Sequence, residues 1–432
     1  VITDPQAPRQ PMPANDGADY LKTVPGFSVI RKGGTDGDPV FRGMAASRVN
    51  ILLDGEQVLG GCGMRMDPPT AYVFPEAYDQ ITVIKGPQTV LHGPGNSAAT
   101  VNFERKPPRW EQPGFAARGS ALGASFGRSD LVADVKGGGP SAYGQLTGTW
   151  ASSDDYTDGA GERVHSAYER WSANAALGYT PNERTNIELS GALSDGEAAY
   201  ADRAMDGVMF ERRNLGLAVD LTQPFANVTR LQAQGYYNYV DHVMDNYSLR
   251  EFTPTPMMPN PVVQNPDRLT IGGRIALDLD WPGGGGTTLG ADLQENQHSL
   301  RATMNQAALP YQELKRTDDA WFRSVGLFGE TELPLAERSR MIAGLRADHW
   351  SARDQRQALP VGMTRVPNPT ANQRRDTTLV SGFGRYEQDL ASTPATVFVG
   401  LGHAQRFPDF WELVSQNKES TDSLSAFNTR PE

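Results

Sequence analysis

Apolar and polar side chains alternate with a period of two in thirteen segments of the chain. Within residues 231–239 the odd positions are Leu, Ala, Gly, Tyr and Tyr, whereas the even positions that start at Arg230 are mostly polar. Successive side chains of a strand point to opposite faces, so the pattern predicts β-strands with one apolar and one polar face. The segments cover residues 114–125, 128–138, 141–152, 168–180, 184–195, 212–222, 227–240, 267–281, 286–298, 320–333, 338–353, 377–391 and 394–406.

The connections between these segments are alternately short and long. The short ones cover residues 137–140, 180–184, 223–227, 282–286, 333–338 and 391–394, and the long ones 153–167, 196–211, 241–266, 299–319 and 354–376. Short turns at one end and long loops at the other are typical of an outer-membrane β-barrel, and a soluble sandwich rarely shows such regularity. The pattern therefore predicts an antiparallel membrane β-barrel.

The number of predicted strands bears on how much of the barrel is present. Single-chain bacterial barrels have an even number of strands, and an open edge would leave unpaired backbone groups in hydrocarbon. We therefore expect the barrel to continue beyond Glu432, so that this chain holds its first part.

Residues 1–106 follow a different pattern from residues 107–432. Short apolar runs such as Val49–Leu53 and residues 80–84 end in Gly- or Pro-containing turns. Such runs are typical of short buried strands. We expect a compact mixed α/β domain over residues 1–106 and the barrel domain over residues 107–432.

Composition and motifs exclude several classes of protein. No apolar stretch approaches the ~20 residues of a membrane helix. The net charge of −11 argues against nucleic acid as a partner. Motifs of zinc proteases, serine hydrolases, nucleotide-binding loops and CxxC redox sites are absent, so we expect no enzyme. No signal peptide is evident, so Val1 is interpreted as a mature or chosen N-terminus.

Several motifs, in order along the chain, resemble those of TonB-dependent outer-membrane receptors. They are residues 24–29 (VPGFSV), 41–43 (FRG), 48–55 (RVNILLDG), 84–87 (IKGP), 91–93 (LHG), 101–102 (VN), 406–408 (RFP) and 411–413 (WEL). One departure is residues 98–100 (AAT), where the family usually has small residues that include Gly-Gly. The resemblance spans essentially the whole chain and is specific for the fold rather than for the substrate.

The resemblance implies a transporter in the outer membrane of a Gram-negative bacterium. The N-terminal domain would be a plug inside a barrel of about twenty-two strands, thirteen of them in this chain. Its partners would be TonB, energised by ExbB and ExbD, together with outer-membrane lipid and lipopolysaccharide. Substrate would bind outside, and a pull by TonB on the plug would open a path.

Two sulfur-containing pairs suggest the substrate. Cys62, the only cysteine, and Met66 form a C-x3-M pair in a glycine-rich plug segment, where a helical turn would place both sulfurs on one side. His242 and Met244 form an H-x-M pair at the end of the seventh predicted strand, on its lumen face. The loop alternation places this pair at the extracellular mouth, where the plug segment could meet it.

Thiolate, thioether and imidazole ligands together favour copper, especially Cu(I), over hard ions. The two pairs also resemble the metal site of the copper-receptor branch of this family, and that resemblance implies ligand roles for Cys62, Met66, His242 and Met244. We therefore expect a copper ion as transported substrate. Two alternatives stay open: a siderophore or other metallophore receptor of the same fold, and a copper redox or electron-transfer protein.

Other methionines lie mainly in predicted outer loops, where they could capture copper weakly or serve as adaptable packing. These are Met205, Met209, Met257, Met258, Met304 and Met363, with Met44 and Met64 in the plug. His298 and His92 are interpreted as weaker candidates, the first at a strand end and the second in a structural turn.

Overall fold

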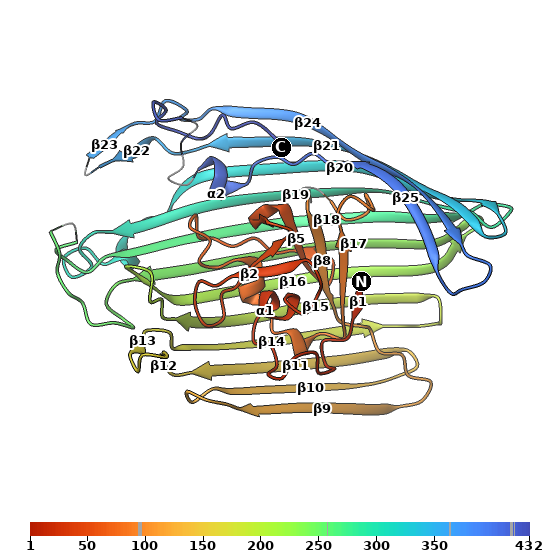
Figure 1. The fold of residues 1–432 in the computed structure, drawn as a ribbon, viewed down its shortest axis with the longest axis horizontal. Coiled ribbons are helices and arrows are strands. Elements are labelled where there is room, and N and C mark those ends of the chain that lie inside the picture. The colour runs from red at the N-terminus through yellow and green to blue at the C-terminus, as the bar shows by residue number, and fades with distance from the viewer. Residues whose placement is uncertain (94–96, 257, 363, 415–417, 419) are drawn as a thin grey trace.

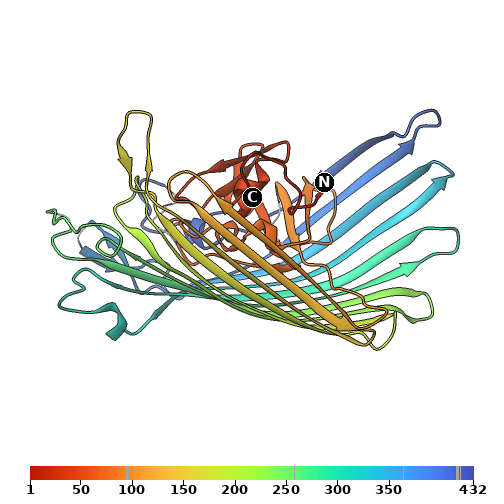
Figure 2. The same ribbon diagram turned by 90° about the horizontal axis from the view of Figure 1, so that it is seen from below.

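The computed structural model describes residues 1–93, 97–256, 258–362, 364–414, 418 and 420–432. Within these residues, thirteen strands form one antiparallel sheet in the order β25-β24-β21-β20-β19-β18-β17-β16-β15-β14-β11-β10-β9. The sheet curves like a trough around the N-terminal plug, which lies on its concave side (Figures 1 and 2). The number of predicted strands, their order along the chain and their antiparallel pairing are confirmed.

The strands of this sheet are long and follow one another along the chain. They are β9 (Gly114–Gly123), β10 (Ser129–Gly139), β11 (Ala142–Ser153), β14 (Tyr168–Tyr179), β15 (Thr185–Ala198), β16 (Asp206–Phe225), β17 (Val228–Asp245), β18 (Val263–Asp280), β19 (Gly286–Thr303), β20 (Thr317–Ala336), β21 (Ser339–Asp354), β24 (Arg374–Asp389) and β25 (Thr396–His403). Two small hairpins lie in the long loops, β12 (Tyr156–Thr157) with β13 (Arg163–Val164), and β22 (Ala358–Val361) with β23 (Thr364–Pro367).

Several strands extend further toward the long loops than the alternation predicts. Strand β16 begins at Asp206 and β17 continues to Asp245. Met209 therefore lies in a strand and not in an outer loop, which corrects the sequence-based expectation. His242 and Met244 likewise belong to β17 itself, paired with β16.

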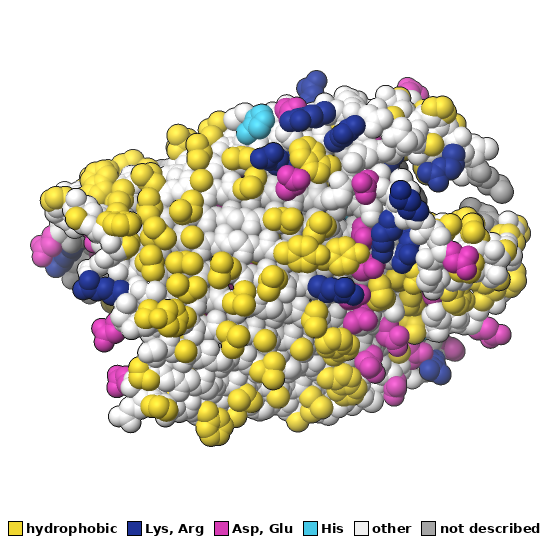
Figure 3. Space-filling model, turned by 180° about the vertical axis from the view of Figure 1, so that it is seen from behind, with side chains coloured by type: hydrophobic (Ala, Val, Ile, Leu, Met, Phe, Trp, Pro, Cys, Tyr) yellow, Lys and Arg dark blue, Asp and Glu magenta, His cyan; other side chains and the backbone are white. Residues whose placement is uncertain are grey.

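The two faces of the sheet differ as the alternation predicts. On β16, Leu215 and Leu217 are exposed on the convex face, whereas Arg212 is buried toward the plug. Hydrophobic side chains spread over the convex face, and most of the charged side chains lie nearer its margins (Figure 3). In the part of the chain that the structure describes, no helix has the length and apolar character needed to cross a membrane.

The plug is a small mixed α/β unit, as its sequence pattern predicts. One sheet has the order β1-β7-β8-β5-β6 and a second the order β2-β3-β4. The elements are β1 (Ile2–Thr3), α1 (Gly17–Leu21), β2 (Phe27–Ile30), β3 (Asp38–Phe41), β4 (Met44–Ala45), η1 (Ala46–Arg48), β5 (Val49–Leu53), β6 (Glu56–Gln57), η2 (Pro69–Tyr72), η3 (Pro75–Ala77), β7 (Gln80–Lys85) and β8 (Ala99–Glu104). The apolar run over residues 49–53 is the fully buried strand β5.

Among the described residues, two further short helices lie outside the plug: η4 (Tyr311–Glu313) in a long loop, and α2 (Phe410–Leu413) after β25. The last strand of the plug sheet ends at Glu104, and the first strand of the curved sheet begins at Gly114. The division at residues 106 and 107 lies between them and stays a prediction.

Candidate metal site

The plug segment that carries Cys62 is a tight loop held by one carboxylate. Asp67 accepts hydrogen bonds from the backbone N–H groups of Gly61 at 2.7 Å and Cys62 at 2.8 Å. The Tyr72 hydroxyl donates to the same carboxylate at 2.9 Å. The N–H of Arg65 bonds to the carbonyl of Cys62 at 2.9 Å, so residues 62–65 form a β-turn and not the helical turn considered from the sequence.

This loop brings Cys62 against the barrel strand β17. The Sγ atom of Cys62 lies 3.6 Å from the Sδ atom of Met244, and both side chains are 5% exposed. Met66 belongs to the same buried hydrophobic cluster, and its carbonyl accepts a hydrogen bond from the Tyr200 hydroxyl at 3.3 Å. Two sulfur atoms separated by 182 residues thus touch across the plug–barrel interface.

His242 reaches this cluster through an aromatic contact. Its ring centroid lies 4.4 Å from that of Phe210, a member of the cluster. The Nδ1 atom lies 2.9 Å from the carbonyl oxygen of Met209, and because a carbonyl only accepts, Nδ1 carries the hydrogen. The Nε2 atom then holds the lone pair, and it is buried without a hydrogen-bond partner. A neutral imidazole whose orientation is fixed by the opposite nitrogen is the form that binds a metal ion.

The environment of Cys62 favours the protonated thiol. Burial, together with the nearby negative charge of Asp67, raises the pKa of the Cys62 thiol to about 12. A metal ion that binds the thiolate would have to displace this proton. Among the described residues, no three His, Cys, Asp or Glu side chains gather closely enough to hold a metal ion. The side chains that meet at this interface include two sulfur atoms in contact and the imidazole ring of His242.

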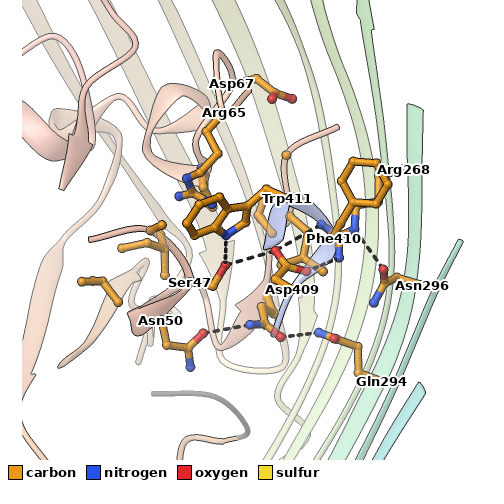
Figure 4. A pocket seen from close by; sticks show the side chains of 18 of the residues that line it. Ser47, Asn50, Arg65, Asp67, Arg268, Gln294, Asn296, Asp409, Phe410 and Trp411 are labelled. Carbon is orange, nitrogen blue, oxygen red and sulfur yellow. Dashed lines mark hydrogen bonds and ion pairs between the residues drawn. The ribbon is translucent and has the colours of Figure 1, made fainter. Parts of the chain in front are cut away.

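A second group of polar side chains lies beside Cys62, around a cavity of about 80 Å³ (Figure 4). Arg268 of β18 forms an ion pair with Asp409 at 2.7 Å, and Asp409 accepts a hydrogen bond from Ser47 of the plug at 3.1 Å. The Trp411 Nε1–H also donates to Ser47, at 3.0 Å. Asp409, the N-cap of α2, and Trp411 within this helix therefore contact both the plug and the barrel wall.

Below this group, an amide chain connects plug and barrel. Gln57 donates to the Oδ1 atom of Asn50 at 3.0 Å and accepts a hydrogen bond from Gln294 of β19 (Figure 4). Sequence reasoning did not single out these residues. The alternation of β19 contains the signal, since Gln294, Asn296 and His298 occupy one face of the strand, and all three are buried.

The remaining methionines do not share one environment. Met304 and Met64 are exposed, whereas Met44 and Met205 pack against the cluster that contains Cys62. Met258 is half-buried. Met257 and Met363 lie outside the described residues. A role of these residues in copper capture stays a prediction.

Comparisons with known proteins support the architecture. A family model for the TonB-dependent receptor plug domain matches residues 1–100, and a model for the TonB-dependent receptor-like β-barrel matches residues 143–432. A search of curated proteins finds no match.

Solved structures of similar fold include the copper transporter OprC, with 47% identity and a TM-score of 0.95 over 100% of this chain and 66% of that chain. The FrpB iron transporter from Neisseria meningitidis has 14% identity and a TM-score of 0.70, over 91% of this chain and 63% of that one. The hemophore receptor HasR of Serratia marcescens has 15% identity and a TM-score of 0.77, over 100% and 67%. This chain thus spans just under two thirds of the length of OprC. Its plug, its long antiparallel strands and the matching family models together show that the chain belongs to the family of TonB-dependent receptors, with a membrane β-barrel and an N-terminal plug domain.

Proposed function

We propose that the protein is a TonB-dependent importer of copper in the outer membrane of a Gram-negative bacterium, with Cys62, Met66, His242 and Met244 as the copper ligands. The observation that carries the proposal is the contact of Cys62 Sγ with Met244 Sδ at 3.6 Å. The 47% identity to the copper transporter OprC over the whole chain supports the same substrate.

The chemistry of the four side chains selects the ion. Thiolate and thioether sulfur favour Cu(I), whereas Mg²⁺, Ca²⁺ and Mn²⁺ prefer oxygen ligands. Zinc sites use Cys and His but seldom Met. The buried Nε2 atom of His242 supplies a nitrogen ligand that has no other partner.

The distribution of the ligands suggests how release is driven. Cys62 and Met66 belong to the plug, whereas His242 and Met244 belong to β17. A bound copper ion would therefore bridge two bodies that a pull on the plug separates. TonB, energised by ExbB and ExbD, would supply that force, and parting the two pairs would break the coordination and release the ion inward.

Metal analysis of the purified full-length protein tests the proposal. Wild type, Cys62→Ala and Met244→Leu are loaded with Cu(I) under anaerobic conditions, washed with a chelator and analysed for copper. Wild type should retain a stoichiometric copper ion, and both variants should lose most of it, because each lacks one soft ligand.

Met64→Leu is the matched control, since Met64 is exposed and lies in the same loop. It should retain copper like the wild type. Equal copper retention in all four proteins would contradict the proposal and favour a metallophore receptor, in which the sulfur contact is only packing. An intense blue colour on addition of Cu(II) would instead favour a copper redox protein.

A further inference from the structure

A second histidine, outside the proposed ligand set, binds the plug loop that carries Cys62 from the side of the barrel. His298 of β19 is buried, and its Nε2 atom lies 2.6 Å from the carbonyl oxygen of Gly61, the residue before Cys62. The carbonyl can only accept, so Nε2 carries the hydrogen and donates it. This is a hydrogen bond between barrel and plug over 237 residues of sequence.

The other side of the His298 ring is also anchored. Its Nδ1 atom lies 2.5 Å from Oδ1 of Asp319 on β20, and this carboxylate is itself largely buried. A carboxylate on one imidazole nitrogen orients the ring and strengthens the hydrogen bond made by the other nitrogen. The His298 ring also stacks on Phe410 of α2, with centroids 3.6 Å apart and planes inclined by 19°.

The backbone of residues 61 and 62 therefore forms hydrogen bonds both within the plug and to the barrel. Asp67, from within the plug, accepts hydrogen bonds from the N–H groups of Gly61 and Cys62. His298, from the barrel, binds the Gly61 carbonyl. These three bonds fix the backbone from which the Cys62 side chain extends toward Met244.

We propose that His298 is a positioning residue for copper: by tying the Gly61 carbonyl to the barrel wall, it holds Cys62 at the distance from Met244 that one ion can bridge. This inference rests on the proposed function. It also implies that movement of the plug breaks the bond between His298 and Gly61 together with the copper coordination, so His298 resists release of the ion.

Two substitutions of the full-length protein separate the hydrogen bond from the stacking. His298→Phe keeps an aromatic ring against Phe410 but removes both ring nitrogens. His298→Gln keeps an N–H group that can reach the Gly61 carbonyl but removes the ring. Copper affinity is measured by competition with a Cu(I) chelator, and the dissociation rate by transfer of copper to that chelator in excess.

We expect His298→Phe to bind copper to the same stoichiometry at saturation, with an affinity ~10–100-fold lower and faster dissociation, as for other residues that orient a metal ligand. His298→Gln should recover part of this loss. X-ray absorption of the Cu(I) form should show fewer sulfur ligands or longer copper–sulfur distances in His298→Phe than in wild type. His349→Phe is the control, because His349 is exposed on the barrel.

A purely structural role would lower the melting temperature of His298→Phe and leave the copper affinity and copper–sulfur distances of the folded protein unchanged, and that result would overturn the inference. If His298→Phe does not fold, Asp319→Asn replaces it, and wild-type affinity in that variant would equally overturn the inference. Cys62→Ala is measured in parallel. Loss of copper in Cys62→Ala with wild-type binding in the other variants would refute only the role of His298, whereas unchanged binding in Cys62→Ala would refute the proposed function.

Discussion

At the scale of single residues, two neighbouring glycines in the plug loop that carries Cys62, Gly60 and Gly61, have very different surroundings. A Cβ atom added to Gly60 would lie 2.0 Å from the backbone oxygen of Asp67, which cannot move without disturbing the loop. A Cβ atom added to Gly61 would meet its nearest neighbour, the carbonyl oxygen of Pro266, only at 3.6 Å, an ordinary contact. The two neighbours therefore form a matched pair for substitution.

We expect Gly60→Ala to destabilise the plug by ~1–3 kcal/mol, as overpacking of a tight site does, and to weaken copper binding. Gly61→Ala should leave both properties close to wild type. Thermal unfolding and the copper competition measurement check the pair. Equal behaviour of the two variants would show that the loop adapts, and that the hydrogen bonds of Asp67 do not fix the position of Cys62.

Sequence reasoning at this scale selected residues by chemistry and missed those that act through geometry. Cys62 and Met244 stood out because sulfur ligands are chemically specific, and the structure places their side chains in contact. The alternation places His298 at a strand end and gives no sign of its partners, because the Gly61 carbonyl lies far away along the chain and Asp319 lies on the next strand. A backbone carbonyl leaves no trace in the sequence, so this bond could not be predicted from it.

At the scale of elements, the alternation predicts every strand of the large sheet but not the full length of several of them. It succeeded where one face is apolar and exposed, as at Leu215, because contrast between the two faces is the signal. It fails toward the long loops, where residues 240–245 at the end of β17 are nearly all buried and the contrast disappears. Loops and plug cover both faces there, so the period is lost although the backbone pairing continues.

The exposed face of β16 yields a prediction about membrane contact. Leu215, near the middle of this strand, is 55% exposed, and Leu309, in a long loop, is 49% exposed. If β16 crosses a bilayer, Leu215→Arg should cost ~2–4 kcal/mol in folding into lipid vesicles, whereas Leu309→Arg should cost little because its surroundings are aqueous. The free energy of folding into vesicles measures both. A small effect at both positions would contradict a lipid-facing role of this surface.

At the scale of the whole molecule, plug and barrel are joined by buried polar groups, and their protonation should affect how firmly the plug is held. Asp36 of the plug is buried and accepts a hydrogen bond from the Tyr200 hydroxyl, in the loop between β15 and β16. Burial raises the pKa of Asp36 to about 7, which outweighs the opposing effect of the Tyr200 hydrogen bond. Burial also raises the pKa of Asp16, in the same region of the plug, to about 6.

The sign of the pH effect follows from these shifts. In the unfolded chain an Asp carboxyl loses its proton near pH ~3.9, whereas folded Asp36 keeps it up to about pH 7. Its stabilising contribution is therefore fully present below the lower value and is lost as pH rises through the window between the two.

We expect the melting temperature of the plug in the full-length protein to fall as pH is raised across this window, with Asp16 adding a change of the same sign. Asp36→Asn should flatten part of this slope, because an amide does not titrate, whereas Asp202→Asn, exposed in the same loop as Tyr200, should leave it unchanged. If Asp36→Asn shows the full wild-type slope, the carboxyl is ionised in the folded protein, and the junction between plug and barrel then owes its strength to other contacts, such as the hydrogen bond of His298 and the ion pair of Arg268 with Asp409.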